Sequence, residues 1–398
     1  MTPRLEIDRI IDDRRTRIIV CCGSGGVGKT TAAAAIGLRA AERGRQTCVL
    51  TVDPARRLAQ SMGLTTLDNT PRRVEGIDGD LHAMMLDMKR TFDEIVEAHA
   101  DPARAAQILA NPFYQSLSSS FAGTQEYMAM EKLGQLRRSD EWDLIVVDTP
   151  PSRSALDFLD APQRLSRFLD GRLIRLLAAP ARVGYLKVIN AGFSMMTGAL
   201  TRLLGAQVLR DAQTFISAFD TMFGGFRERA EATYRLLQAP GTSFLVVAAP
   251  EPDALREASY FVERLDGERM PLAGLILNRV HTPVASRLSA ARSLAAAETL
   301  ESFPNGQAVP DNGPSSALAV AALRLHAERM QLSEREQRVT ASFTSVHPAV
   351  PVAEVAALPL DVHDLAGLRR IGELMGAVLA RGDDPPEPPD SAAAPGGA

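Results

Sequence analysis

A glycine-rich loop near the N-terminus contains the residues whose types and spacing point most directly to chemistry. Residues 23–30 fit the pattern G-x-x-x-x-G-K-[ST], in which backbone N–H groups close around the phosphates of a nucleoside triphosphate. We expect Lys29 to reach the β- and γ-phosphates and the Thr30 hydroxyl to bind Mg²⁺. The predicted phosphate-binding residues are Gly23, Ser24, Gly25, Gly26, Val27, Gly28, Lys29, Thr30 and Thr31.

The segments on either side of this loop support the nucleotide interpretation. Residues 17–22 are apolar after the first position, and three of them, residues 18–20, are β-branched, which predicts a short buried strand. Residues 31–43 contain no Pro, are rich in Ala and precede Gly44, which predicts a helix with a C-terminal glycine. The dipole of that helix would favour phosphate at its N-terminus. A glycine-rich turn that arose by chance would not require a strand before it and a helix after it, so these two segments favour a phosphate loop.

Asp53 follows a second predicted strand, residues 47–52. Ligand chemistry in open parallel α/β sheets collects at the carboxyl ends of strands, and an acid there can orient or deprotonate an attacking water. An Asp before Pro54 is also typical of a helix start, where the side chain only caps the helix. The spacing alone leaves both roles open for Asp53.

Asp148 ends a further apolar strand, residues 144–147. This pattern is typical of the Walker-B strand of nucleotide-binding proteins, whose carboxylate holds Mg²⁺ through water. The alternative is a buried strand followed by a turn built from Asp-Thr-Pro. The upstream phosphate loop favours the magnesium role for Asp148.

The pattern along the chain predicts an α/β fold: a doubly wound, mostly parallel sheet with an inserted α-helical subdomain. The core would comprise residues 1–90, 141–158 and 240–381, the helical subdomain 91–140 and 159–239, and a disordered tail 382–398. Further strands are predicted at 81–86, 244–249, 272–277 and 350–358, further core helices at 252–265, 315–342 and 364–379, and an irregular exposed insertion at 281–314.

One face in the predicted helical subdomain is rich in large apolar residues. Met196, Leu200, Leu203 and Leu204 share a helical face, with Phe193 and Met195 nearby. A methionine-rich face adapts to varied apolar partners and would suit a client groove. The core of an ordinary helical subdomain gives the same pattern, so both interpretations remain open.

The composition excludes several classes of protein. The chain has 398 residues, 45% hydrophobic and 23% charged, as in ordinary soluble proteins, and its net charge of −4 argues against a nucleic-acid partner. Its three cysteines form neither a disulfide framework nor a C-x-x-C pair. Residues 1–16 are too charged for a signal peptide, and no uncharged apolar run is long enough to span a membrane. We expect a cytoplasmic protein; the acid-free segment 171–210 leaves contact with a membrane surface open.

Four segments in this order resemble the deviant-Walker-A ATPases of the ArsA family, which contains arsenite-pump ATPases and targeting ATPases for tail-anchored membrane proteins. They are Gly25-Gly26-Val27-Gly28-Lys29-Thr30-Thr31, Asp53-Pro54-Ala55, Asp148-Thr149-Pro150-Pro151 and Leu358-Pro359-Leu360. The resemblance implies that ATP and Mg²⁺ bind at Lys29 and Thr30, that Asp53 acts on water, and that Asp148 opens the second switch. It also implies that Asn278 contacts adenine, which the segment around Pro359 covers.

The chain departs from this family pattern in three places. Ser24 stands where the family has a signature lysine that crosses a dimer interface; serine removes the charge and about five ångströms of reach. Arg153-Ser154 replace the usual Gly-His of the second switch. The C-x-x-C zinc pair of many targeting members is missing and the six histidines are scattered, so we expect no zinc.

The resemblance implies a Mg²⁺-dependent ATPase of the ArsA type, whose nucleotide cycle opens and closes a dimer and captures a client, such as a hydrophobic or membrane-protein segment. Two alternatives stay open: the ATPase subunit of a metalloid-anion efflux system, and a regulatory switch of the partitioning or division type. Because Ser24 removes the signature lysine, we favour a heterodimer with a related chain that retains it, over substitution by Arg153 in a homodimer.

Overall fold

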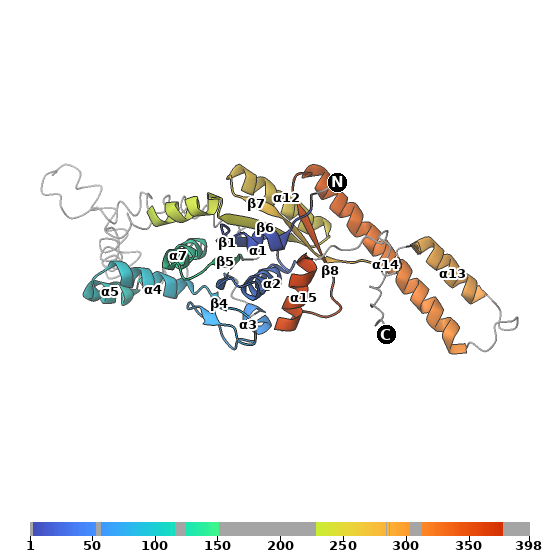
Figure 1. Cartoon of the computed structure of the whole chain (residues 1–398), viewed down its shortest axis with the longest axis horizontal. Coiled ribbons are helices and arrows are strands. Elements are labelled where there is room, and N and C mark those ends of the chain that lie inside the picture. The colour runs from blue at the N-terminus through green and yellow to red at the C-terminus, as the bar shows by residue number, and fades with distance from the viewer. Residues whose placement is uncertain are drawn as a thin grey trace, which may run out of the picture.

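A single eight-stranded sheet forms the centre of the protein (Figure 1). The computed structural model describes residues 3–52, 57–112, 114–115, 124–150, 228–283, 285, 287–302 and 313–376. The strand order is β3-β4-β2-β5-β1-β6-β7-β8, and every neighbouring pair is parallel except β3 and β4. The glycine-rich loop therefore leaves the sheet from a central strand.

The strands consist of nearly continuous apolar residues because helices cover both faces of the sheet. All residues of β1, β2 and β5 are buried. The strands are β1 (Ile18–Cys22), β2 (Thr47–Thr51), β3 (Arg72–Arg73), β4 (Leu81–Met85), β5 (Leu144–Asp148), β6 (Thr242–Ala248), β7 (Leu272–Val280) and β8 (Val352–Ala356).

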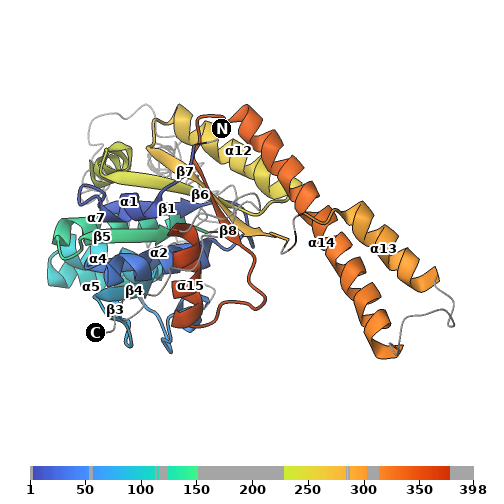
Figure 2. The same ribbon diagram turned by 45° about the vertical axis from the view of Figure 1, so that its right-hand side comes forward.

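Helices lie on both faces of the sheet. Helix α12 lies on one face, and α2 and α15 lie on the other (Figures 1 and 2). The helices are α1 (Ile7–Asp12), α2 (Lys29–Glu42), α3 (Arg57–Ser61), α4 (Met88–His99), α5 (Pro102–Leu109), α7 (Thr124–Ser139), α12 (Pro252–Gly267), α13 (Ala290–Ser302), α14 (Gly313–Val346) and α15 (Leu365–Gly376); residues 228–238 are also helical.

Helix α2 approaches the sheet closely because its inward side chains are small. Residues 32–35 are all alanine and all buried. At Gly37 an added Cβ would lie only 2.3 Å from Cγ2 of Val49 on β2, so even a methyl group would push the helix outward. This close packing fixes the N-terminus of α2 at the end of the glycine-rich loop.

Most strand predictions are confirmed to within a few residues, and the doubly wound α/β fold with them. The prediction of an irregular insertion at 281–314 is wrong over residues 290–302, which form α13. Its Gly and Pro residues lie outside 290–302, which is rich in Ala and free of helix breakers. Helix α1 and strand β3 were not predicted, since they are only six and two residues long.

The division into an ATPase core and a helical subdomain stays a prediction. Residues 151–227, which contain most of the second half of the predicted subdomain, lie outside the described residues, as does the predicted disordered tail 382–398. Among the described residues, no helix combines the length and the apolar character that crossing a membrane requires.

Candidate nucleotide site

The glycine-rich loop joins the end of β1 to the first turn of α2. Gly26 and Gly28 have φ angles of 79° and 94°, in the left-handed region that side chains other than glycine rarely adopt. Gly28 is the N-cap of α2, and no atom lies within 4 Å of a Cβ built on Gly26. The loop therefore leaves open space beside a helix N-terminus, as a phosphate cradle requires.

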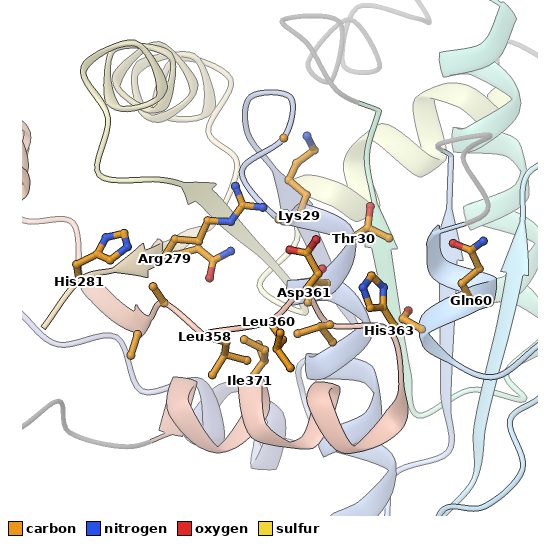
Figure 3. A pocket seen from close by; sticks show the side chains of 18 residues that line it. Lys29, Thr30, Gln60, Arg279, His281, Leu358, Leu360, Asp361, His363 and Ile371 are labelled. Carbon is orange, nitrogen blue, oxygen red and sulfur yellow. The ribbon is translucent and has the colours of Figure 1, made fainter. Parts of the chain in front are cut away.

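Lys29 lies in the first turn of α2 and folds back over the loop. Its ammonium group donates a hydrogen bond of 2.8 Å to the backbone carbonyl of Ser24. The residue is only 6% exposed, and its side chain lies at the cavity beside the loop (Figure 3). A bound triphosphate would place anionic oxygens within reach of this ammonium group.

Thr30 in the first turn of α2 meets Asp148 at the end of β5. The Thr30 hydroxyl donates a 2.8 Å hydrogen bond to Oδ2 of Asp148, and the Thr51 hydroxyl donates another to the same oxygen, also of 2.8 Å. Asp148 is fully buried at the end of β5, where it pairs in register with Cys21 of β1 and Thr51 of β2. A hydroxyl and a carboxylate are oxygen ligands that suit Mg²⁺, so these residues fit that ion.

Asn278 of β7 contacts the phosphate loop and holds it by a hydrogen bond. Its side-chain Nδ2 donates a 2.8 Å hydrogen bond to the carbonyl of Val27. A Cβ on Gly28 would lie 2.3 Å from the same nitrogen, so the loop and the amide are in close contact. The adenine contact expected of Asn278 stays a prediction; the structure shows its bond to the loop.

A cavity of about 930 Å³ opens beside the loop. Strands β7 and β8 end at its border, and the segment after β8 forms another side (Figure 3). Leu358 and Leu360 line the cavity, whereas Pro359 between them is exposed and is not one of the lining residues. The volume is of the size that small-molecule and cofactor sites occupy.

Several polar residues in this cavity were not found from the sequence. Arg279, Asp361 and His363 lie around it together with Lys29 and Thr30 (Figure 3). Arg279 has a φ of 63°, which is strained for a residue with a side chain and marks the end of β7 as a special conformation. In the sequence, only position pointed to these residues: Arg279 follows Asn278, and Asp361 and His363 come shortly after Pro359. The sheet brings the two segments together at the cavity.

Some of the expected residues cannot be placed. Asp53, Arg153 and the apolar face at 193–204 lie outside the described residues. Among the described residues, no group of three or more His, Cys, Asp or Glu is arranged to hold a metal ion.

All three cysteines are buried inside the sheet. Removal from water raises the pKa of the Cys22 and Cys48 thiols to about 12 and raises the pKa of Cys21 well above its usual value. The thiols are therefore protonated at neutral pH and are poor nucleophiles and poor metal ligands.

A glycine-rich loop on a central parallel strand, a hydroxyl–carboxylate pair that fits Mg²⁺ and a cavity beside them are the features of a P-loop nucleoside triphosphatase. A family model described as anion-transporting ATPase matches residues 16–297. The chain belongs to this ArsA-type family and is an ATPase, which confirms the resemblance noted in its motifs.

Curated relatives agree with this assignment. The ATPase GET3 of Podospora anserina is 25% identical over 285 residues, which cover 71% of this chain and 78% of that protein. The ATPase GET3B of Arabidopsis thaliana is 25% identical over 301 residues, covering 71% of this chain and 68% of that protein. With the ATPase GET3 of Malassezia globosa the identity is 29% over 163 residues, and this match spans less than half of the relative, 47%.

The first prediction concerns the contact between Gly28 and Asn278. Gly28→Ala should lower nucleotide affinity by about tenfold or more, because its Cβ meets the Asn278 amide and displaces the loop. Gly44→Ala is the matched control: its φ of 79° gives similar strain, but nothing lies within 4 Å of the added Cβ. Titration with a fluorescent nucleotide analogue should show a loss for Gly28→Ala alone; equal affinities would contradict the bracing role of Asn278.

The second prediction concerns Lys29. Lys29→Ala should reduce ATP turnover by about 100-fold or more while leaving the fold intact, because it removes the cation at the β- and γ-phosphates. Lys89→Ala, which removes an exposed lysine paired with Asp93 on α4, is the control. Steady-state turnover and thermal melting measured on both variants decide the matter, and near-normal turnover in Lys29→Ala would overturn the assignment of the site.

Proposed function

We propose that this ATPase is Mg²⁺-dependent and couples its nucleotide cycle to the opening and closing of a dimer and to the capture and release of an apolar client. The observation that carries the proposal is the Thr30–Asp148 hydrogen bond, 2.8 Å long, which links the first turn of α2 to the end of β5. A ligand that enters between these two groups affects both the phosphate loop and the segment that follows Asp148.

The chain's own residues have separate tasks in this cycle. Thr30 and Asp148 would hold Mg²⁺, the Asp148 carboxylate through water, and Lys29 would exchange the Ser24 carbonyl for phosphate oxygens. Bound Mg²⁺ supplies charge neutralisation at the β- and γ-phosphates. Asp53, which follows β2 in the chain, would orient the attacking water and accept its proton.

The segment after Asp148 would transmit the state of the nucleotide. It leads directly into residues 151–227, which include the methionine-rich face at 193–204. This connection supports a client surface in that region. The resemblance to the ArsA family, whose members include targeting ATPases for tail-anchored membrane proteins, supports an apolar, membrane-derived client. The alternative remains that this face is the ordinary core of a helical subdomain.

An ATPase subunit of an anion-efflux system is the second candidate, and the family description favours it. A metalloid anion would call for reactive thiolates, which are its soft ligands. In this chain all three cysteines are buried in the sheet, with raised thiol pKa values. This observation supports the client-binding proposal over the metalloid pump.

We further propose that the dimer pairs this chain with a related one. In this class each signature lysine serves the phosphates of the opposite subunit, and two copies of Ser24 would leave both sites without that cation. A partner with an intact lysine would complete the site on this chain. Arg153, two positions after Pro151, is the alternative source of charge in a homodimer.

The third prediction tests the role of Asp53. Asp53→Asn should retain ATP binding but lose turnover by about 100-fold or more, since an amide cannot accept the proton of the water. Asp87→Asn is a suitable control because Asp87 caps α4 through the Arg90 N–H, and asparagine caps a helix about equally well. Measured turnover that survives in Asp53→Asn would assign Asp53 to helix capping. The same variant is suited to pull-down of the client.

The fourth prediction tests the pairing. The purified chain should show weak turnover, and Ser24→Lys should raise it by about an order of magnitude or more, because the variant supplies the missing cation in trans. Light scattering with ATP and Mg²⁺ would report the assembly of both forms. A chain that dimerises alone with ATP, hydrolyses it briskly and loses that rate in Arg153→Ala would contradict the heterodimer.

A further inference from the structure

The order of the strands decides in which direction a nucleotide lies in the cavity. Lys29, Thr30 and Asp148 lie at the glycine-rich loop and the end of β5, where the triphosphate and Mg²⁺ would bind. In the sheet, β5 and β7 lie on opposite sides of β1, the strand that leads into the loop. The cavity continues past the loop to Arg279 and His281, at and just after the end of β7 (Figure 3). With the terminal phosphates on the β5 side, the base lies on the β7 side.

The lining of the cavity on the β7 side suits a purine base. Ala356, Ala357 and Leu358, which end and follow β8, form an apolar part of its wall. Asn278, which holds the loop, also lines the cavity, and His281 is the last lining residue of this segment. In mostly apolar pockets, the few polar groups determine which ligand is selected.

A buried carboxylate of α14 holds the ring of His281. Oε1 of Glu336 lies 2.7 Å from Nδ1 of the ring, and Oε2 accepts a 2.9 Å hydrogen bond from the backbone N–H of His281. Glu336 is only 7% exposed, whereas the side chain of His281 is 45% exposed. Within the described residues, Nε2 of His281 makes no hydrogen bond. The ring is therefore fixed through Nδ1 and leaves Nε2 open to a ligand.

The contact with Glu336 decides which ring nitrogen carries the hydrogen. An ionised carboxylate only accepts hydrogen bonds, so we assign the hydrogen of the neutral ring to Nδ1. Nε2 is then an acceptor. Adenine has an amino group, a donor, at C6, whereas guanine and hypoxanthine have an oxygen, an acceptor, at the same position. An acceptor at Nε2 matches adenine and is left facing a second acceptor when a 6-oxopurine is bound.

We propose that His281 selects adenine over 6-oxopurines in the substrate of this ATPase, by accepting a hydrogen bond from the N6 amino group at Nε2. Glu336 is the positioning residue that fixes the ring and the place of its hydrogen. The inference takes the direction of the nucleotide from the proposed magnesium role of Thr30 and Asp148, and it is independent of the dimer and of the client. It gives α14 a part in the ATPase site, because the carboxylate that orients the ring comes from that helix.

The ratio of the affinities for ATP and ITP tests the selection, because these nucleotides differ only in the base, which carries an amino group or an oxygen at C6. Competition of each nucleotide with a fluorescent analogue, in the presence of Mg²⁺, should show ATP binding about tenfold more tightly than ITP. His281→Ala should bring this ratio close to one. His363→Ala is the matched control: it removes another imidazole from the cavity, on the side of Thr30 and Gln60, and should keep the wild-type ratio (Figure 3).

Glu336→Gln tests the positioning role with almost no change of volume. The backbone N–H of His281 needs an acceptor, so the amide oxygen turns toward it and the amide NH₂ toward Nδ1. The hydrogen of the ring then moves to Nε2, which becomes a donor. The ratio should invert, so that ITP binds more tightly than ATP, with an unchanged melting temperature. A loss of packing alone would lower both affinities without inverting their ratio.

Four results would overturn the proposal. They are a wild-type ratio near one, a wild-type preference for ITP, a ratio that His281→Ala leaves unchanged, and a ratio that Glu336→Gln does not invert. Thr30→Ala separates these results from a failure of the magnesium site, because the two nucleotides share the same triphosphate. This variant should weaken the binding of both nucleotides together and keep their ratio. Binding that Thr30→Ala leaves unaffected would contradict the magnesium role and the direction of the nucleotide derived from it.

Discussion

The contact between Thr30 and Asp148 is the constraint on which the site depends. It forms because β1 lies between β5 and β6, in a register that pairs Cys21 with Asp148 and places the end of β5 beside the loop. A shift of one residue in that pairing would turn the Asp148 side chain to the other face of the sheet. The buried apolar strands on both sides resist such a shift, so the core packing fixes the geometry of the phosphate site.

The end of β7, in the other half of the sheet, forms a second side of the cavity. Strand β7 supplies Asn278, which holds the loop, and continues to His281, which lines the cavity. The backbone N–H of His281 donates to Glu336 of α14 at 2.9 Å, and its Nδ1 lies 2.7 Å from the same carboxylate. Helix α14 projects from the sheet beside α13 (Figure 2), so the contact with Glu336 joins the end of β7 at the cavity to this pair of helices.

The sequence predicted well whatever depends on local pattern and poorly whatever depends on long-range pairing. The apolar strands and the loop from Gly23 to Thr30 were readable because glycine, lysine and threonine stand at fixed spacing after a buried strand. Arg279 and Asp361 were not, since they reach the cavity through the pairing of β7 with β8. Helix α13 was missed for another reason: the Pro and Gly residues around it suggested a loop, although they lie outside it.

In the proposed heterodimer, the serine at position 24 would affect the two subunits unequally. Lys29 bonds to the backbone carbonyl of Ser24, an interaction that any residue at this position can provide. The loop of this chain can therefore keep its own conformation whether residue 24 is serine or lysine. The side chain at position 24 differs only in what it offers across an interface, where serine provides a short neutral hydroxyl and lysine a long cation. In the proposed dimer, loss of the lysine would thus leave the phosphate loop of this chain intact and remove a contribution to the site on the opposite subunit.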